Sequence, residues 1–85
     1  MAELATIAGF LAQLLEDTSV PKNVRSAIAR AKERMNNPNE DEAIAGAIYA
    51  LDEVSNDINL PMHARTMIWN ILSELEGMKQ RQNEQ

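Results

Sequence analysis

Few side chains in this 85-residue sequence are of types that carry out catalysis or bind metals. The chain has no cysteine and one histidine, His63, which excludes disulfides, thiolate zinc sites and a di-metal centre that needs two helical histidines. His63 is expected in the first turn of a helix, where the helix dipole disfavours imidazolium, so we interpret it as a solvent-facing turn residue.

One acidic run, Glu40-Asp41-Glu42, has the composition of a metal-binding segment. It lacks the glycine and the distal glutamate of an EF-hand, and its simpler interpretation is the acidic first turn of a helix. The 3 glycines are isolated from one another, so no phosphate-binding loop is present. We therefore predict no catalytic residue, no metal and no cofactor, and we expect that the protein is not an enzyme.

Basic residues are concentrated in one segment. Residues 21–35 carry a net charge of +4, whereas residues 36–57 carry −6 and the whole chain −5. Two interpretations remain open: complementarity between neighbouring helix faces, or a basic strip that binds RNA or an acidic partner. An isoelectric point near 4.7 and the lack of interleaved aromatics argue against nucleic-acid binding. The candidate basic strip consists of Lys22, Arg25, Arg30, Lys32 and Arg34.

A second candidate surface follows Pro61. Met62, Arg65 and Trp69 share one helical face, and their residue types are enriched at protein interfaces. Phe10, which lies beside the main apolar stripe of its own helix, is a further candidate member. The alternative is that Trp69 widens the hydrophobic core.

Apolar residues recur with helical spacing in four stretches, which begin near residues 2, 21, 39 and 61. Asn39 is expected to cap the third helix, with Glu42 completing a capping box. Gly77 is the predicted residue after the fourth helix, and the polar tail 78–85 is expected to fray. No stretch alternates apolar and polar residues as a strand does, so strands are not expected.

The most specific signal is an internal repeat. The segment 17–28 recurs 40 residues later as 57–68, and Ile7-Ala8-Gly9 recurs 37 residues later as Ile44-Ala45-Gly46. Each copy contains a helix, a short acidic turn and a second helix opened by proline, which suits a first helical turn because its missing N–H is not needed there. The matched glycines are mid-helix, and we predict that both lie where two helices approach closely.

The repeat also contains an aspartate before each turn and an arginine one turn into the following helix. These residues form two candidate pairs, Asp17 with Arg25 and Asp57 with Arg65. We predict that each arginine reaches back toward its aspartate and fixes the turn. A binding face with two symmetry-related arginines is the functional alternative.

Two hairpins, at about residues 2–37 and 39–77, would bury their apolar stripes against each other. We predict one all-α domain over residues 1–77, an antiparallel four-helix bundle made of two repeated hairpins. The alternative is an open pair of stacked hairpins. A domain of this size has a small core, which makes self-association through an additional apolar face attractive.

The stretches Val20-Pro21-x-x-x-Arg25 and Asp57 to Glu76 carry a family resemblance. There the chain resembles the short archaeal proteins grouped as uncharacterised protein family number zero-one-four-seven. In that family the turn usually reads Asp-Pro-Asn, whereas this chain has Asp57-Ile58-Asn59. The resemblance implies a four-helix bundle from an archaeal cytoplasm, and it implies no activity and no functional residue.

The sequence therefore leaves the biological role unknown and favours one class of function. The leading hypothesis is a small helical module for protein–protein interaction or assembly, with a protein partner or a second copy as its ligand. An RNA-associated accessory protein that uses the basic strip is the alternative. No run of about 18 apolar residues predicts a membrane helix, and the start Met1-Ala2-Glu3 lacks the basic residues of a signal peptide, so we expect a cytoplasmic location and no membrane partner.

Overall fold

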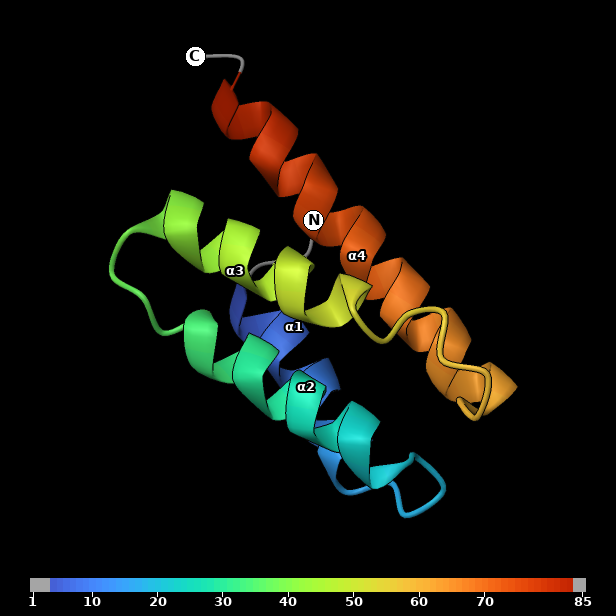
Figure 1. The fold of residues 1–85 in the computed structure, drawn as a ribbon. Coiled ribbons are helices and arrows are strands. Elements are labelled where there is room, and N and C mark those ends of the chain that lie inside the picture. Colours follow the sequence, from blue (N-terminus) through green and yellow to red (C-terminus); the bar gives the residue numbers. More distant parts are fainter. Residues whose placement is uncertain (1–3, 84–85) are drawn as a thin grey trace.

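The chain folds into four α-helices joined by short turns (Figure 1). A computed structural model describes the backbone of residues 4–83 and the side chains of residues 4–80. No strand occurs in the described residues, and the molecule measures 40 × 20 × 20 Å. The predicted all-α class is confirmed. The helices are α1 (Leu4–Leu15), α2 (Lys22–Arg34), α3 (Glu40–Asp52) and α4 (Met62–Asn83).

The helices form two hairpins, α1 with α2 and α3 with α4, which pack into the predicted four-helix bundle (Figure 1). Packing between the hairpins is uneven, because α2 and α3 make the most extensive contact and α1 and α4 make the least. One contiguous core lies between the helices, and its fully buried members include Leu11, Ile28, Leu51 and Ile68. Burial of these apolar side chains is the main force that stabilises a bundle of this kind.

Proline and asparagine define where helices begin. Pro21 and Pro61 directly precede α2 and α4, and their carbonyls accept hydrogen bonds of 2.9 Å from the backbone N–H groups four residues on. The side chain of Asn39 caps α3 by accepting a hydrogen bond of 3.2 Å from the N–H of Glu42. The N–H of Asn39 donates to the side chain of Asn37 at 2.8 Å. The predicted cap is therefore confirmed, but Asn37, rather than the Glu42 side chain, accepts the second hydrogen bond.

Helix α4 is longer than the sequence pattern predicted. It passes through Gly77 and ends at Asn83, so the predicted helix end at Gly77 is wrong. The reason is that the apolar stripe continues one turn further, to Met78, whose side chain is buried against the core. Residues 78–83 are thus helical, and the last two residues of the expected fraying tail, 84 and 85, lie outside the described part of the chain.

The two matched glycines have different surroundings. A Cβ atom added at Gly46 of α3 would lie 3.1 Å from Cδ and 3.2 Å from Cβ of Arg34 on α2, which confirms a close approach of these two helices. A Cβ atom added at Gly9 would meet nothing within 4 Å. The prediction that Gly9 faces a neighbouring helix is therefore wrong, because α1 does not approach α4 as closely as α3 approaches α2.

Candidate functional site

The two proline-containing turns are tied to each other by polar contacts between hairpins. Nε2 of His63, in the first turn of α4, lies 2.7 Å from Oδ2 of Asp17. Nδ2 of Asn23, in the first turn of α2, donates to Oδ2 of Asp57 at 3.0 Å. Asn23 and His63 occupy equivalent positions in the repeat, as do the two aspartates. The two turns are therefore joined by two equivalent contacts, each between an aspartate of one hairpin and a first-turn residue of the other. This is expected for two hairpins related by a pseudo-twofold axis.

The structure brings together one of the two predicted aspartate–arginine pairs. Nη2 of Arg65 donates to the backbone carbonyl of Asp57 at 3.0 Å and thereby closes the second turn. No hydrogen bond joins Arg25 to Asp17 in the described part of the chain, because Ser19 and His63 contact the Asp17 carboxylate instead. Nε of each arginine is buried without a hydrogen-bond partner within residues 4–80.

The hydrogen bonds at the turns favour ionised carboxylates. Hydrogen bonding from the Ser19 side chain, followed by that from His63, lowers the pKa of Asp17 to about 2. Hydrogen bonds from the Asn23 side chain and from the backbone N–H of Asn59 also lower the pKa of Asp57. Both turns therefore carry negative charge at neutral pH.

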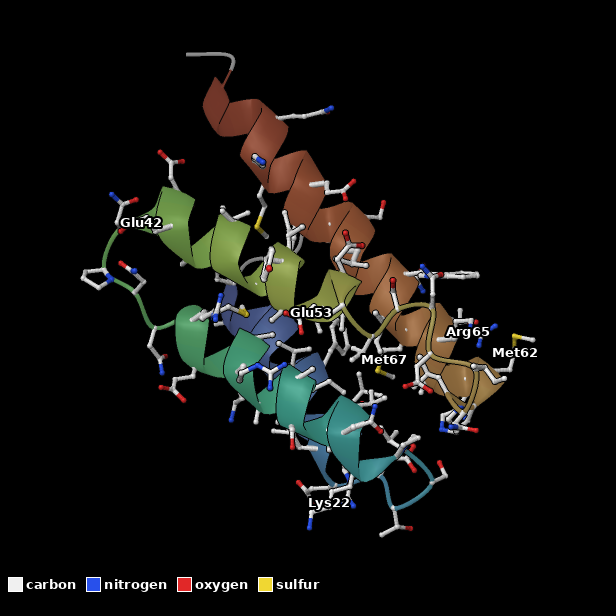
Figure 2. All side chains as sticks on the ribbon, in the orientation of Figure 1. Lys22, Glu42, Glu53, Met62, Arg65 and Met67 are labelled. Carbon is white, nitrogen blue, oxygen red and sulfur yellow. The ribbon has the colours of Figure 1, made fainter. Side chains whose placement is uncertain are left out.

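Two residues of the basic strip on α2, Arg30 and Arg34, contact α3 or the turn that follows it. Nη2 of Arg30 contacts Oε2 of Glu53 at 3.2 Å, and both side chains are about half exposed. The aliphatic part of Arg34 lies against Gly46 of α3, whereas Figure 2 shows Lys22 at the outer end of α2, pointing away from the bundle. These positions support complementarity between neighbouring helices for at least part of the strip.

The four residues of the candidate interface are divided between two sides of α4, since three belong to α4 itself and Phe10 belongs to α1. Met62 and Trp69 are 73% and 51% exposed, and Arg65 shares their flank (Figure 2 labels Met62 and Arg65). Phe10, which is 40% exposed, lies instead beside Met67 of α4 in a groove. Because Met67 and Trp69 are two residues apart, they point about 200° away from each other around the helix. Phe10 therefore does not extend the Trp69 surface.

The groove with Phe10 in its wall runs between α1 and α4 and has a volume of about 400 Å³. This volume falls within the range of protein binding sites. Its apolar residues are Ile7, Phe10, Met67 and Ile71. Its polar residues are His63, Thr66, Asn70 and Glu74.

The internal repeat explains why α1 and α4 pack less closely than α2 and α3. Phe10 is equivalent to Ala47, three places after the repeated Ile-Ala-Gly begins, and Met67 and Ile71 are equivalent to Ala27 and Ala31. The three alanines are fully buried, and their small side chains let α2 and α3 pack closely. Bulky residues at the same positions hold α1 and α4 apart. Sequence reasoning missed this groove, although comparison of the two repeats by side-chain size carries the signal.

The repeated glycine also has different surroundings in the α2–α3 and α1–α4 contacts. Gly46 lies against Arg34 in the close α2–α3 contact, and the equivalent residues on the other side are Gly9 and Glu74. Glu74 lines the groove, and Gly9 has open space beside it. The groove thus occupies the place where exact internal symmetry would put a tight helix–helix contact.

Neither a metal site nor a membrane helix is visible in the described residues. No group of three or more histidine, cysteine, aspartate or glutamate side chains within them is arranged to hold a metal ion. Among the described helices, none combines the length and apolar character needed to cross a bilayer.

These features define a class of protein: an all-helical bundle of two fused hairpins, packed more extensively between α2 and α3 than between α1 and α4. The chain belongs to the uncharacterised protein family UPF0147, whose family model matches residues 1–78. The resemblance inferred from the sequence is thereby confirmed. A family described as uncharacterised assigns no function to its members.

Relatives and solved structures agree with this assignment. A UPF0147 protein of Methanothermobacter thermautotrophicus is 46% identical over 76 residues, covering 87% of this chain and 74% of that protein. A UPF0147 protein of Methanocaldococcus jannaschii is 46% identical over 78 residues, covering 89% of this chain and 84% of that protein. Both organisms are archaea, as expected from the resemblance.

Two crystal structures share the fold. A protein of unknown function, MMP1188, superposes with a TM-score of 0.82 at 44% identity, covering 86% of this chain and 85% of that one. A UPF0147 protein of Thermoplasma acidophilum superposes with a TM-score of 0.78 at 36% identity, covering 86% of this chain and 88% of that one.

Proposed function

We propose that this protein is a cytoplasmic protein–protein interaction module, rather than an enzyme, and that it binds its partner in the α1–α4 groove. The observation that carries the proposal is the groove itself, a concavity of about 400 Å³ with Phe10 in its wall. Aromatic and aliphatic residues beside a hollow are typical of surfaces on which a partner buries its anchoring side chains. His63, at one end of the groove, contacts Asp17 at 2.7 Å. We interpret this pair as structural rather than catalytic, because the equivalent Asn23–Asp57 contact joins the other turn in the same way without an imidazole.

The size difference between the two sides of the bundle supports this interpretation. Buried alanines in the more extensive α2–α3 contact indicate that this fold can pack such helices closely, so the bulky residues at the equivalent α1–α4 positions are not required by the architecture. Ile71 belongs to the core, but Phe10 and Met67 are only partly buried, so these two side chains contribute less to the stability of the monomer than fully buried ones do. They are better suited to binding a partner.

A pull-down from the native cytoplasm, with and without nuclease, tests the proposal. The matched bait variants are Phe10→Ser, in the groove, and Trp69→Ser, on the opposite flank of α4. We expect a protein partner that survives nuclease, is lost with Phe10→Ser and is kept with Trp69→Ser. Circular dichroism and thermal unfolding of each variant establish that the fold is retained.

Other results of this experiment would overturn the proposal. Loss of the partner with Trp69→Ser but not with Phe10→Ser moves the interface to the surface formed by Met62, Arg65 and Trp69. A partner released by nuclease favours the RNA-associated alternative, which relies on the basic strip of α2. Sedimentation equilibrium tests the remaining alternative, a homodimer that buries either surface.

A further inference from the structure

The α1–α4 groove has a shape and a charge that specify its occupant further, on the basis of the function proposed above. We infer that the groove binds an amphipathic helix of a protein partner, with apolar side chains facing the groove and basic side chains on the flanks of that stripe.

The shape of the groove favours a helix. Its α4 wall extends from His63 to Glu74, which corresponds to about 16 Å, or three helical turns. Its apolar residues come from two neighbouring helices, Ile7 and Phe10 from α1 and Met67 and Ile71 from α4. Two helices that flank an apolar groove are a recurring binding site for a third helix, which places residues i, i+3 or i+4, and i+7 between them.

The positions equivalent to the groove in the repeat lead to the same conclusion. In the other half of the molecule, the equivalent residues Ala27 and Ala31 are buried and share the side of α2 on which Arg34 contacts Gly46 of α3. The α1–α4 side presents the same pattern of helix faces with larger side chains and more space between them. The groove therefore has helix faces of the kind that pack together in the other half of the molecule, and it leaves Phe10 and Met67 partly exposed above the buried Ile7 and Ile71.

The charges around the groove are acidic. Helix α1 contains no charged residue, and the residues that line the groove include no lysine or arginine. Glu74 lies at one end of the groove, and at the other end His63 is in contact with Asp17 at 2.7 Å. Hydrogen bonds lower the pKa of Asp17 to about 2, so this carboxylate stays ionised throughout the physiological range.

These charges favour a basic helix over a second copy of this chain as the occupant of the groove. Another copy that docked by the same groove would bring its own Glu74 against the groove that already contains Glu74, and like charges placed together oppose association. A basic helix would place lysine or arginine beside Glu74, the carboxylate that lines the groove. The net charge of −5 further favours the approach of a basic partner.

Titration of a synthetic amphipathic peptide, built from leucine on one face and lysine on the others, tests the inference. Binding is followed by backbone amide shifts in NMR spectra of the full-length protein and by fluorescence anisotropy of the labelled peptide. We expect the shifts to concentrate on α1 and on the part of α4 between His63 and Glu74. A peptide of the same leucine pattern with glutamine in place of lysine should bind at least ~5-fold more weakly, because it lacks the charge-assisted contacts.

A charge-matched pair of protein variants separates a specific contact from general attraction. Glu74→Lys and Glu76→Lys change the net charge equally, but Glu76 follows Glu74 by two residues and so points about 200° away from it around α4. We expect Glu74→Lys to weaken binding of the lysine peptide ~5-fold or more and Glu76→Lys to change it less than twofold. Phe10→Ser should abolish the groove shifts with either peptide.

Each contrary outcome has a definite meaning. Equal weakening by both lysine variants, or shifts outside the groove, means that only net charge attracts the peptide and overturns the inference. Equal binding of the glutamine peptide overturns the basic character of the partner. A concentration-dependent dimer abolished by Phe10→Ser makes the occupant a second copy. If neither peptide binds, the helical occupant is wrong, whereas the proposed function is decided separately by the pull-down with Phe10→Ser and Trp69→Ser.

Discussion

The imidazole of His63 lies 2.7 Å from the carboxylate of Asp17 and so joins the start of α4 to the turn that follows α1. The equivalent pair, Asn23 with Asp57, joins the start of α2 to the turn that precedes α4. The two contacts hold the hairpins together at one end of the bundle. The first contact joins a carboxylate to an imidazole, whereas the second joins a carboxylate to an amide, which carries no titratable proton.

Acid should destabilise the bundle through its turn aspartates. The pKa of Asp17 is lowered from 3.8 to about 2 in the folded chain, so its contribution to stability is present above pH 3.8 and is lost as the pH falls toward 2. We expect the melting temperature of Asp17→Asn to depend less on pH across this window than that of the wild type. Thermal unfolding followed by circular dichroism measures the difference.

The control for this experiment is Asp52→Asn, which removes one charge from the exposed surface of α3 and leaves both turn contacts intact. If Asp17→Asn and Asp52→Asn flatten the acid profile equally, the hydrogen bonds of Asp17 are not responsible for its pH dependence.

Gly9→Ala should stabilise the protein. Gly9 is in the middle of α1, with no atom within 4 Å of an added Cβ, so alanine gains helix propensity of about 1 kcal/mol at no steric cost. The melting temperature should rise by about 4–8 °C. Gly46→Ala should gain less, or lose stability, because its Cβ would lie 3.1 Å from Cδ of Arg34. A larger gain for Gly46→Ala would contradict the close α2–α3 approach.

Exchanging side-chain size between equivalent positions should have unequal effects. Ala47→Phe introduces into the tight α2–α3 contact the residue found at the equivalent position of α1, and overpacking of this kind costs about 1–3 kcal/mol or more. Phe10→Ala removes a side chain that is 40% exposed, so its cost should fall below the 3–5 kcal/mol typical of a buried phenylalanine. Urea unfolding of the two variants gives both values, and a tolerated Ala47→Phe would refute our explanation of the groove.

Removal of the part of α4 after Gly77 should destabilise the domain. A chain that ends at Gly77 lacks Met78, whose side chain is 7% exposed and belongs to the core, and burial of such a side chain is worth about 1.5–3 kcal/mol. A chain that ends at Gln80 keeps Met78 and provides the control. Equal melting temperatures for the two truncated chains would show that residues 78–80 add nothing to the core.

Nucleic-acid binding should be weak or absent at physiological salt. Arg30 is paired with Glu53, which leaves fewer cations on α2 to neutralise phosphates. Fluorescence anisotropy with a labelled single-stranded RNA is the measurement. Tight binding that falls steeply with salt, and that weakens in Lys22→Ala, would make RNA binding by the basic strip the leading hypothesis.

The sequence predicted the helices well because helix formation leaves a periodic pattern of local origin. The prolines at 21 and 61 and the cap at Asn39 act through their own backbone and a few neighbouring residues. The end of α4 was misplaced because Met78, several residues along the same stripe, supplies tertiary packing that outweighs the helix-breaking tendency of Gly77. Local signals therefore specify helix starts better than helix ends in this chain.

The site was harder to predict because it depends on contacts between segments far apart in the sequence. Asp17 pairs with His63 across 46 residues rather than with Arg25, and no local spacing distinguishes these choices. Phe10 was recognised as an unusual residue beside its stripe, but its association with Met67 depends on which helices become neighbours. The grouping of Phe10 with Trp69 failed for the same reason.

The contact between α2 and α3, together with the two ties at the turns, has a consequence for the origin of the chain. The hairpins meet through the most extensive helix contact in the bundle, yet only the short segment from Met35 to Asn39 connects them covalently. A gene for a single hairpin whose product paired with its own copy could have given rise to this protein by duplication and fusion. If the hairpins still recognise each other without their connection, two separately produced halves mixed in solution should reassemble into the native bundle.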